Sequence, residues 1–180
     1  MKQAEDNEVT KPPEIVQLDA GKNKAAVDAQ AEAPLTVAIS SRAVFQLDAE
    51  DEIWRSQGTA AYRAYQRKHE REPLAPGPAF AFVKRLLALN DIRPEAPLVD
   101  VILLSRNDPD TGLRAFNSIE HHGLPISRAA FLSGSSPFRY LEAFHAALFL
   151  SMNEEDVNAA IEAGHPAGRV LPTAVADDVS

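Results

Sequence analysis

The segment Leu98–Gly123 constrains the fold of this chain more than any other. It begins with a nearly continuous apolar run, Leu98–Leu104 (LVDVILL), which is typical of a strand that is covered on both faces. A polar loop follows, and then a helical pattern over Asp110–His122 that ends at Gly123, a residue type that commonly terminates helices. A buried strand followed directly by a helix is the unit from which parallel α/β sheets are built.

The same alternation recurs along the chain. Further strands are expected at four short apolar runs: Leu35–Ser40, Ala129–Leu132, Ala147–Leu150 and Arg169–Leu171. Helices are expected between them at Ala49–Gln57, Thr59–Arg71, Ala79–Asn90, Phe138–His145 and Glu154–Ala163. The pattern predicts an α/β, Rossmann-like fold, with a mostly parallel sheet and helices on both faces.

Capping and breaking residues refine these helices. Asp48 is expected to cap the first helix and Asn153 the last, because short polar side chains accept a hydrogen bond from the first turn. Gly58 should separate the first two helices. Residues Asp48–Arg71 therefore form a small helical insert after the first strand.

Composition divides the chain into three parts. Residues 1–34 contain few large apolar side chains and are expected to form a disordered N-terminal tail, with a helix over Ala20–Ala33 as the alternative. Residues 35–172 form the α/β domain. Residues 173–180 form a polar C-terminal tail that is expected to fray.

Charge and residue usage exclude several classes of protein. With 26 acidic and 18 basic residues in 180, the net charge of −8 argues against a large nucleic-acid interface. The absence of cysteine excludes disulfides and thiolate metal sites. The sequence contains neither an apolar run of membrane-spanning length nor a secretory signal, so no membrane association and a cytoplasmic location are expected.

Polar loops follow four of the predicted strands, at Ser40–Arg42, Ser105–Asp110, Ser133–Pro137 and Ser151–Asn153. In parallel sheets, ligands bind beyond the carboxyl ends of the strands, so these loops should line one site. Arginine and hydroxyl side chains suit phosphate groups. The candidate substrate-binding residues are Ser40, Ser41, Arg42, Ser105, Arg106, Asn107, Ser136 and Asn153.

Structural roles are the alternatives for the charged residues. Arg42 and Arg106 could form ion pairs with Asp108, Asp110 or Glu154 instead of binding an anion. A capping role at the start of the following helix is favoured for Asp108 or Asp110 over a role as a metal ligand. The pair His121-His122 has no third ligand near it, so a metal site there is not expected.

Similar alternatives apply to the hydroxyl and aromatic residues. The Ser105 hydroxyl could satisfy a backbone group of its own loop. Tyr62, Tyr65 and Phe80 could form a lid over a nucleotide base, although packing is the more usual role of aromatic residues at helical spacing.

Four segments together resemble the cytosolic 5'-nucleotidase I family. They are Leu98–Gly123, Leu35–Phe45 (LTVAISSRAVF), Pro73–Phe80 (PLAPGPAF) and Ser151–Val157 (SMNEEDV), and the resemblance extends from Leu35 to about Leu171. It implies the haloacid-dehalogenase-like (HAD-like) phosphohydrolase fold. It also implies magnesium-dependent hydrolysis of nucleoside 5'-monophosphates to nucleoside and phosphate.

The resemblance also implies which catalytic groups to look for. In that superfamily the first loop carries a nucleophilic aspartate and a second aspartate two residues later, and the third loop carries a lysine. Here the first loop reads Ser40-Ser41-Arg42, the second keeps the hydroxyl of Ser105, and Arg139 is the cation nearest to the third. The chain therefore resembles the degenerate N-terminal half of the family, and the catalytic Asp-Gly-Asp is expected in a second half. No catalytic residue and no metal ligand is assigned to this chain.

Three hypotheses follow. The chain is a 5'-nucleotidase-family segment that is inactive by itself, a non-catalytic nucleotide-binding or interaction domain, or a truncated product. Self-association, or pairing with a separately encoded catalytic half, is expected through apolar surface on the Trp54, Tyr62 and Tyr65 face of the insert and at the sheet edge near Val170.

Overall fold

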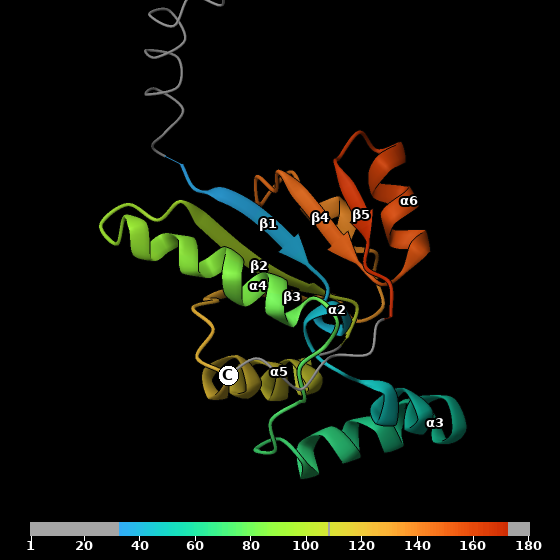
Figure 1. The fold of residues 1–180 in the computed structure, drawn as a ribbon. Coiled ribbons are helices and arrows are strands. Elements are labelled where there is room, and N and C mark those ends of the chain that lie inside the picture. Colours follow the sequence, from blue (N-terminus) through green and yellow to red (C-terminus); the bar gives the residue numbers. More distant parts are fainter. Residues whose placement is uncertain (1–32, 108, 173–180) are drawn as a thin grey trace, which may run out of the picture. The chain divides into compact units, whose positions relative to one another are not determined.

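A single parallel sheet organises the domain (Figure 1). The computed structural model describes residues 33–107 and 109–172, so the predictions for residues 1–32 and 173–180 lie outside the described residues. The five strands are β1 (Leu35–Ile39), β2 (Val99–Ser105), β3 (Arg128–Phe131), β4 (Leu148–Ser151) and β5 (Ala167–Arg169). Their order is β3-β2-β1-β4-β5 and every pair is parallel, which confirms the predicted α/β, Rossmann-like fold.

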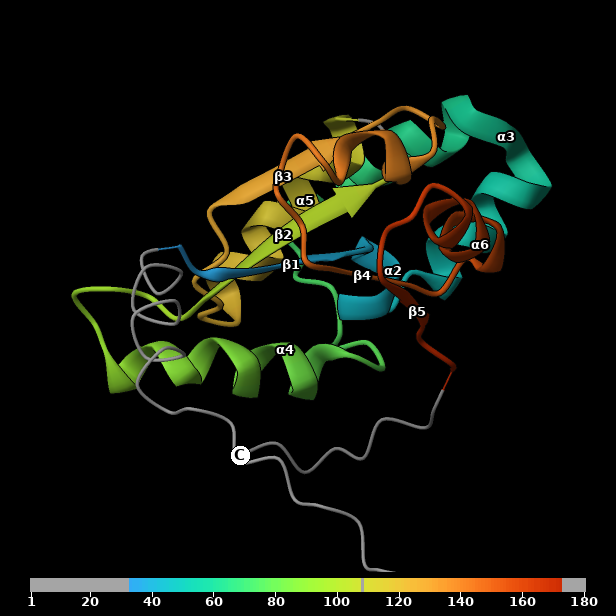
Figure 2. The ribbon, with the colours of Figure 1, turned by 90° about the horizontal axis from the view of Figure 1, so that it is seen from above.

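Helices connect the strands. They are α2 (Ser41–Val44), α3 (Asp48–Lys68), α4 (Phe80–Leu87), α5 (Pro109–His121) and α6 (Glu154–Glu162), with short 3-10 helices η1 (Ala88–Ile92) and η2 (Pro137–Tyr140). The hydrophobic contacts place α4 and α5 on one face of the sheet and the η2 segment and α6 on the other. Figure 2 shows α4 and α6 on opposite sides of the sheet.

The burial of strand β2 on both faces explains why its sequence is almost continuously apolar. Val101 and Leu103 pack beneath α4 and α5, whereas Ile102 and Leu104 pack on the opposite face. All four side chains are fully buried. Because neighbouring side chains point to opposite faces, a strand covered on both sides needs an apolar residue at nearly every position.

A buried polar network fixes the helical insert to α5. The Arg114 guanidinium donates to the Glu50 carboxylate at 2.6 Å and to the Gln66 side-chain oxygen at 3.2 Å. It also donates to the backbone carbonyl of Glu72 at 2.9 Å. Glu50 and Gln66 lie in the two halves of α3, so one arginine holds both halves. Gly58, with φ 80° and ψ 180°, interrupts α3 between them, as predicted.

The start of the insert differs from its prediction. The residue that precedes α3 is Leu47, and Asp48 is the first helical residue rather than its cap. The chain enters the helix from a backbone contact in which Gln46 N–H donates to the Ala75 carbonyl at 2.9 Å. This contact fixes the entry angle, and Asp48 contributes only its charge to the first turn.

Two predicted elements near the C-terminal end also differ. The helix expected over Phe138–His145 is only the 3-10 helix η2 followed by turns. Phe138, Leu141 and Phe144 all pack on one face of the sheet, so this segment buries its apolar side chains without a continuous α-helix. Strand β5 begins two residues earlier than predicted, because Ala167 pairs with Phe149 of β4.

Candidate active-site edge

The carboxyl ends of the strands meet at one edge of the sheet. In Figures 1 and 2 the strands point towards α3, and the loops that follow β1, β2, β3 and β4 leave from this edge. Strand order reverses between β1 and β4, since β2 and β3 extend to one side and β5 to the other. Such a switch point is where ligands bind in open α/β sheets. The edge therefore lies where the sequence analysis expected a site.

Asp156 organises one side of this edge. Its carboxylate accepts two hydrogen bonds from Arg106 Nε, at 3.0 and 2.9 Å, and one from the Ser136 hydroxyl at 2.8 Å. The Asp156 side chain is 3% exposed and the Arg106 side chain is 37% exposed. The pKa of the Arg106 guanidinium is raised, chiefly by its hydrogen bonds to Asp156. Arg106 is thus held as a cation by a buried carboxylate.

Asn153 belongs to the same cluster. Its side-chain oxygen accepts a hydrogen bond from the Asp156 backbone N–H at 3.0 Å, which is the predicted cap of α6. The structure therefore brings three predicted residues, Arg106, Ser136 and Asn153, together around Asp156. The sequence analysis treated Asp156 only as an acidic residue of the first helical turn. Asp156 lies in Ser151–Val157, one of the segments that resemble the family, and this was the one hint of its role in the sequence. The segment alone does not show which of its carboxylates is buried.

Serine hydroxyls occupy the ends of β1 and β2. Ser41 Oγ and Ser105 Oγ form a buried hydrogen bond of 2.8 Å. Ser105 Oγ also accepts a bond from the Asn107 backbone N–H at 3.1 Å, which confirms the structural alternative for this hydroxyl. In the segments that follow the same two strands, Ser40 Oγ and Asn107 Nδ2 are both buried and have no hydrogen-bond partner among the residues described. Buried polar atoms of this kind are uncommon and indicate a missing partner such as a ligand or a water molecule.

Arg42 does not join the other candidates. Its guanidinium forms an ion pair with Asp51 of α3 and lies 4.0 Å from Asp48. Burial raises the pKa of the Asp51 carboxyl above its ordinary value, and the charge of Arg42 opposes that rise. Arg42 therefore ties the insert to α2, the short helix after β1. Both arginines form ion pairs, as the structural alternative predicted. Within the described residues, the partners are Asp51 for Arg42 and Asp156 for Arg106, and these differ from the partners expected from the sequence.

Two of the aromatic residues considered for a lid, and one histidine, pack against the core. Tyr62 is 7% exposed and accepts a hydrogen bond from the Thr111 hydroxyl at 3.1 Å, and Phe80 is 5% exposed. His122 lies against Phe45 and Phe80 and contacts the Leu74 carbonyl at 2.8 Å. A lid made of Tyr62 and Phe80 is therefore wrong. The expected apolar surface of Trp54, Tyr62 and Tyr65 is also wrong at Tyr62.

Among the described residues, no cluster of three or more His, Asp or Glu side chains is placed to bind a metal ion. The buried carboxylate at the edge, Asp156, is engaged by Arg106 and Ser136, whose positive charge and hydroxyl proton occupy the positions that a cation would take. The side chains of Asp108 and Asp110 lie outside what the structure describes.

Comparison with known proteins decides the family. The sequence profile of the 5'-nucleotidase family matches residues 27–180. Human cytosolic 5'-nucleotidase 1B is 37% identical over 135 residues, which is 72% of this chain. The chain belongs to the cytosolic 5'-nucleotidase I family. The resemblance noted in the sequence is thereby confirmed.

The match to the cytosolic 5'-nucleotidase I family covers only part of its human member. The chain spans about a fifth of the length of the human relative, since the match covers 22% of that protein. Within the described range, no helix is long and apolar enough to cross a membrane. The edge of this family member combines hydroxyl, amide and guanidinium donors with one buried carboxylate that is already paired.

Proposed function

We propose that this chain is a nucleoside 5'-monophosphate-binding segment of a cytosolic 5'-nucleotidase that does not itself perform the hydrolysis. The observation that carries the proposal is the donor chemistry at the ends of β1 and β2. Ser40 Oγ and Asn107 Nδ2 are buried hydrogen-bonding groups without a partner among the described residues, and both are able to donate to an oxygen atom. Each of these two donors suits a phosphate oxygen.

The neighbouring groups suit an anion. Ser41 follows Ser40 directly in the chain, and its hydroxyl is hydrogen-bonded to that of Ser105. Arg106, between Ser105 and Asn107, supplies a permanent positive charge. The hydrogen bonds from Arg106 to Asp156 use Nε and Nη2, so they leave Nη1 for another acceptor. Backbone and side-chain donors of this type bind and orient a phosphate without breaking its ester bond.

The same edge lacks the groups that cleave the ester. A covalent mechanism requires a carboxylate at the end of β1, where this chain has Ser40-Ser41-Arg42. Asp156 is not available for attack, because it is buried and holds Arg106 and Ser136. The 180 residues contain no Asp-Gly-Asp sequence. Magnesium and the nucleophile of the family reaction would come from an Asp-Gly-Asp segment, and no step through magnesium is derived for the residues of this chain.

Two measurements on the 180-residue chain test the proposal. With AMP and magnesium, we expect no release of phosphate above the blank, while equilibrium dialysis shows AMP binding to the chain. Ser40→Ala and Asn107→Ala should each weaken AMP binding about tenfold, since each removes a donor to a charged group. Ile92→Ala, an exposed apolar residue of η1, is the matched control and should leave binding unchanged. Steady AMP turnover that disappears in Ser40→Ala would refute the proposal.

A second candidate function, an interaction domain, has its own observation. Leu171 is 59% exposed just beyond β5, and Ile161 is 54% exposed on the adjacent α6. Within the described residues, β5 pairs with β4 alone, so the other edge of β5 is open. An open strand edge beside apolar side chains suits association with a second copy or with an Asp-Gly-Asp segment. Sedimentation over a wide concentration range tests self-association, and Leu171→Asp should abolish it.

A further inference from the structure

Trp54 is a large aromatic residue that the packing of this domain leaves uncovered. It is the one tryptophan of the 180 residues, and it is 54% exposed on the first half of α3. Of the other aromatic side chains of the insert, Tyr62 is buried and Tyr65 is partly buried. Packing among the described residues therefore does not account for Trp54, and its indole ring is accessible to a ligand.

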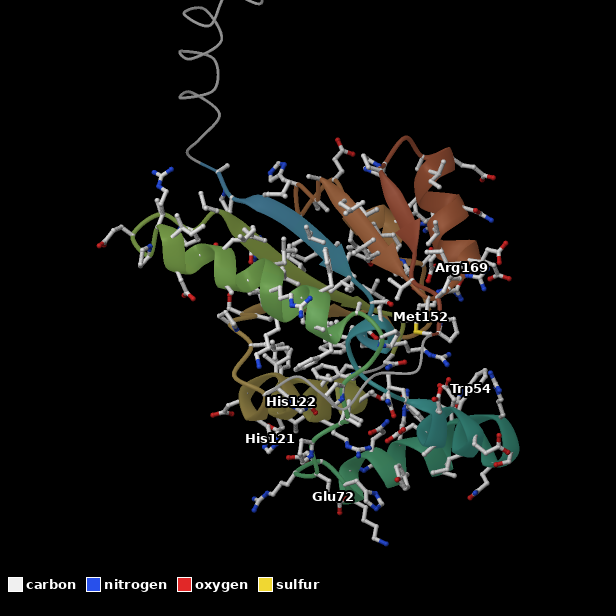
Figure 3. The ribbon with its side chains drawn as sticks, in the orientation of Figure 1. Trp54, Glu72, His121, His122, Met152 and Arg169 are labelled. Atoms are coloured by element: carbon white, nitrogen blue, oxygen red, sulfur yellow. The ribbon has the colours of Figure 1, made fainter. Side chains whose placement is uncertain are left out.

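The helix face that carries Trp54 is turned to the carboxyl edge. Asp51, three residues before Trp54, forms the ion pair with Arg42 in α2, the short helix after β1. Residues three apart lie on the same face of a helix, so Trp54 shares the face that Asp51 presents to the strand ends. Figure 3 shows Trp54 on the side of α3 that looks towards Met152 and Arg169, which lie at the ends of β4 and β5.

Two anchors hold this face in place. Asp51 is tied to Arg42, and Glu50 is tied to Arg114 within a buried network. Both anchors lie one helical turn before Trp54, and the interruption at Gly58 lies one turn after it. The first half of α3 is thus a short helix with a fixed beginning, and it carries an exposed indole ring.

We propose that Trp54 is the stacking platform for the base of a bound nucleoside 5'-monophosphate. The inference rests on the proposed function, because the phosphate is taken to lie at Ser40 and Asn107 on the same edge. An indole ring offers a flat apolar face to purines and pyrimidines alike, and base stacking on an aromatic side chain adds to affinity with little dependence on the base. Phosphate donors and an aromatic platform would then recognise the two ends of the ligand.

Fluorescence of Trp54 provides a direct test, because the chain has no other tryptophan. AMP and adenosine should quench Trp54 emission on binding, whereas inorganic phosphate and ribose 5-phosphate should not. Trp54→Ala should weaken AMP binding about tenfold in equilibrium dialysis and leave ribose 5-phosphate binding unchanged. Trp54→Phe keeps an aromatic ring and should retain most of the affinity. Ile92→Ala, an exposed apolar residue of η1 on the opposite edge, should have no effect.

The outcomes separate the two proposals. If AMP binds and Trp54→Ala binds it equally well, the stacking role is wrong and the proposed function stands. If neither the native chain nor any variant binds AMP, both are wrong. If Trp54 emission changes with protein concentration in the absence of nucleotide, a second copy covers the ring and the stacking role is overturned. Thermal melting of Trp54→Ala should match the native chain, since an exposed ring adds little to stability.

Discussion

Arg106 and Asp156 join the ends of two strands that are not neighbours. Arg106 follows β2 and Asp156 lies in α6 after β4, while β1 separates these strands in the sheet. The pair is reinforced by Ser136 from the loop after β3. One buried carboxylate therefore links the segments that follow β2, β3 and β4. In the sheet, β1 lies between β2 and β4.

Removal of the cation from this pair should destabilise the domain. In Arg106→Ala, the Asp156 carboxylate, whose side chain is 3% exposed, keeps only the Ser136 hydroxyl among its side-chain partners. We expect a loss of about 2–4 kcal/mol in the free energy of unfolding, since a buried charge is left without its counterion. Urea denaturation measures this loss. As a control, Glu154→Ala breaks the exposed pair with Arg169 and should cost less than about 0.5 kcal/mol. Equal losses in the two variants would contradict the prediction.

The anchor of the insert can be tested in the same way. Glu50→Ala leaves Arg114, whose side chain is 7% exposed, without its carboxylate partner. The expected loss is about 3 kcal/mol in the free energy of unfolding, because a buried guanidinium keeps its charge. Glu50→Gln preserves a hydrogen-bond acceptor and should lose less. If Glu50→Ala melts with the native curve, the insert is not fixed by this network.

The raised pKa of Asp51 makes its contribution to stability depend on pH. Burial raises this pKa above the ordinary value of 3.8, so the folded state holds the proton more tightly than the unfolded state. Stability therefore falls as the pH rises from 3.8 through the folded-state pKa, because ionising the partly buried Asp51 carboxyl costs free energy in the folded state. The native chain should lose stability relative to Asp51→Asn across this interval.

The ion pair with Arg42 supplies the control for this pH dependence. The charge of Arg42 lowers the pKa of Asp51, so its removal should raise that pKa further. In Arg42→Ala, the fall in stability relative to the Arg42→Ala, Asp51→Asn double variant should extend to higher pH. Urea denaturation at half-unit steps above pH 3.8 resolves both curves. Parallel curves for native chain and Asp51→Asn would show that burial does not perturb this carboxyl.

The break in α3 requires glycine for reasons of backbone conformation alone. Gly58 has φ 80° and ψ 180°, and a Cβ at this position would meet nothing within 4 Å. Because the cost is conformational rather than steric, Gly58→Ala should lower the free energy of unfolding by about 1–3 kcal/mol. Ser56→Ala, two residues earlier on the exposed surface of the helix, is the control and should change it little. An unchanged melting temperature in Gly58→Ala would mean that the two helix halves straighten without cost.

The sequence determined the architecture because its signals are local. A strand covered on both faces must be apolar throughout, and Leu98–Leu104 could be recognised for that reason. Gly58, Gly123 and Asn153 act on the backbone around them, and each interrupts, ends or caps a helix as predicted. The family followed from long ordered segments of residues, which the comparisons confirmed.

Tertiary structure decided which polar groups are partners. Arg42 and Arg106 look alike in the sequence, but one pairs with Asp51 in the insert and the other with Asp156 after β4. Both pairs join segments that meet only when the sheet is assembled, or when the insert folds back on the strand ends. Burial has the same origin, since the packing of strands and helices covers Tyr62 and leaves Trp54 open. Local sequence patterns do not predict such contacts, because the energy of an ion pair or of a buried ring depends on the distance between groups in space and not on their separation along the chain.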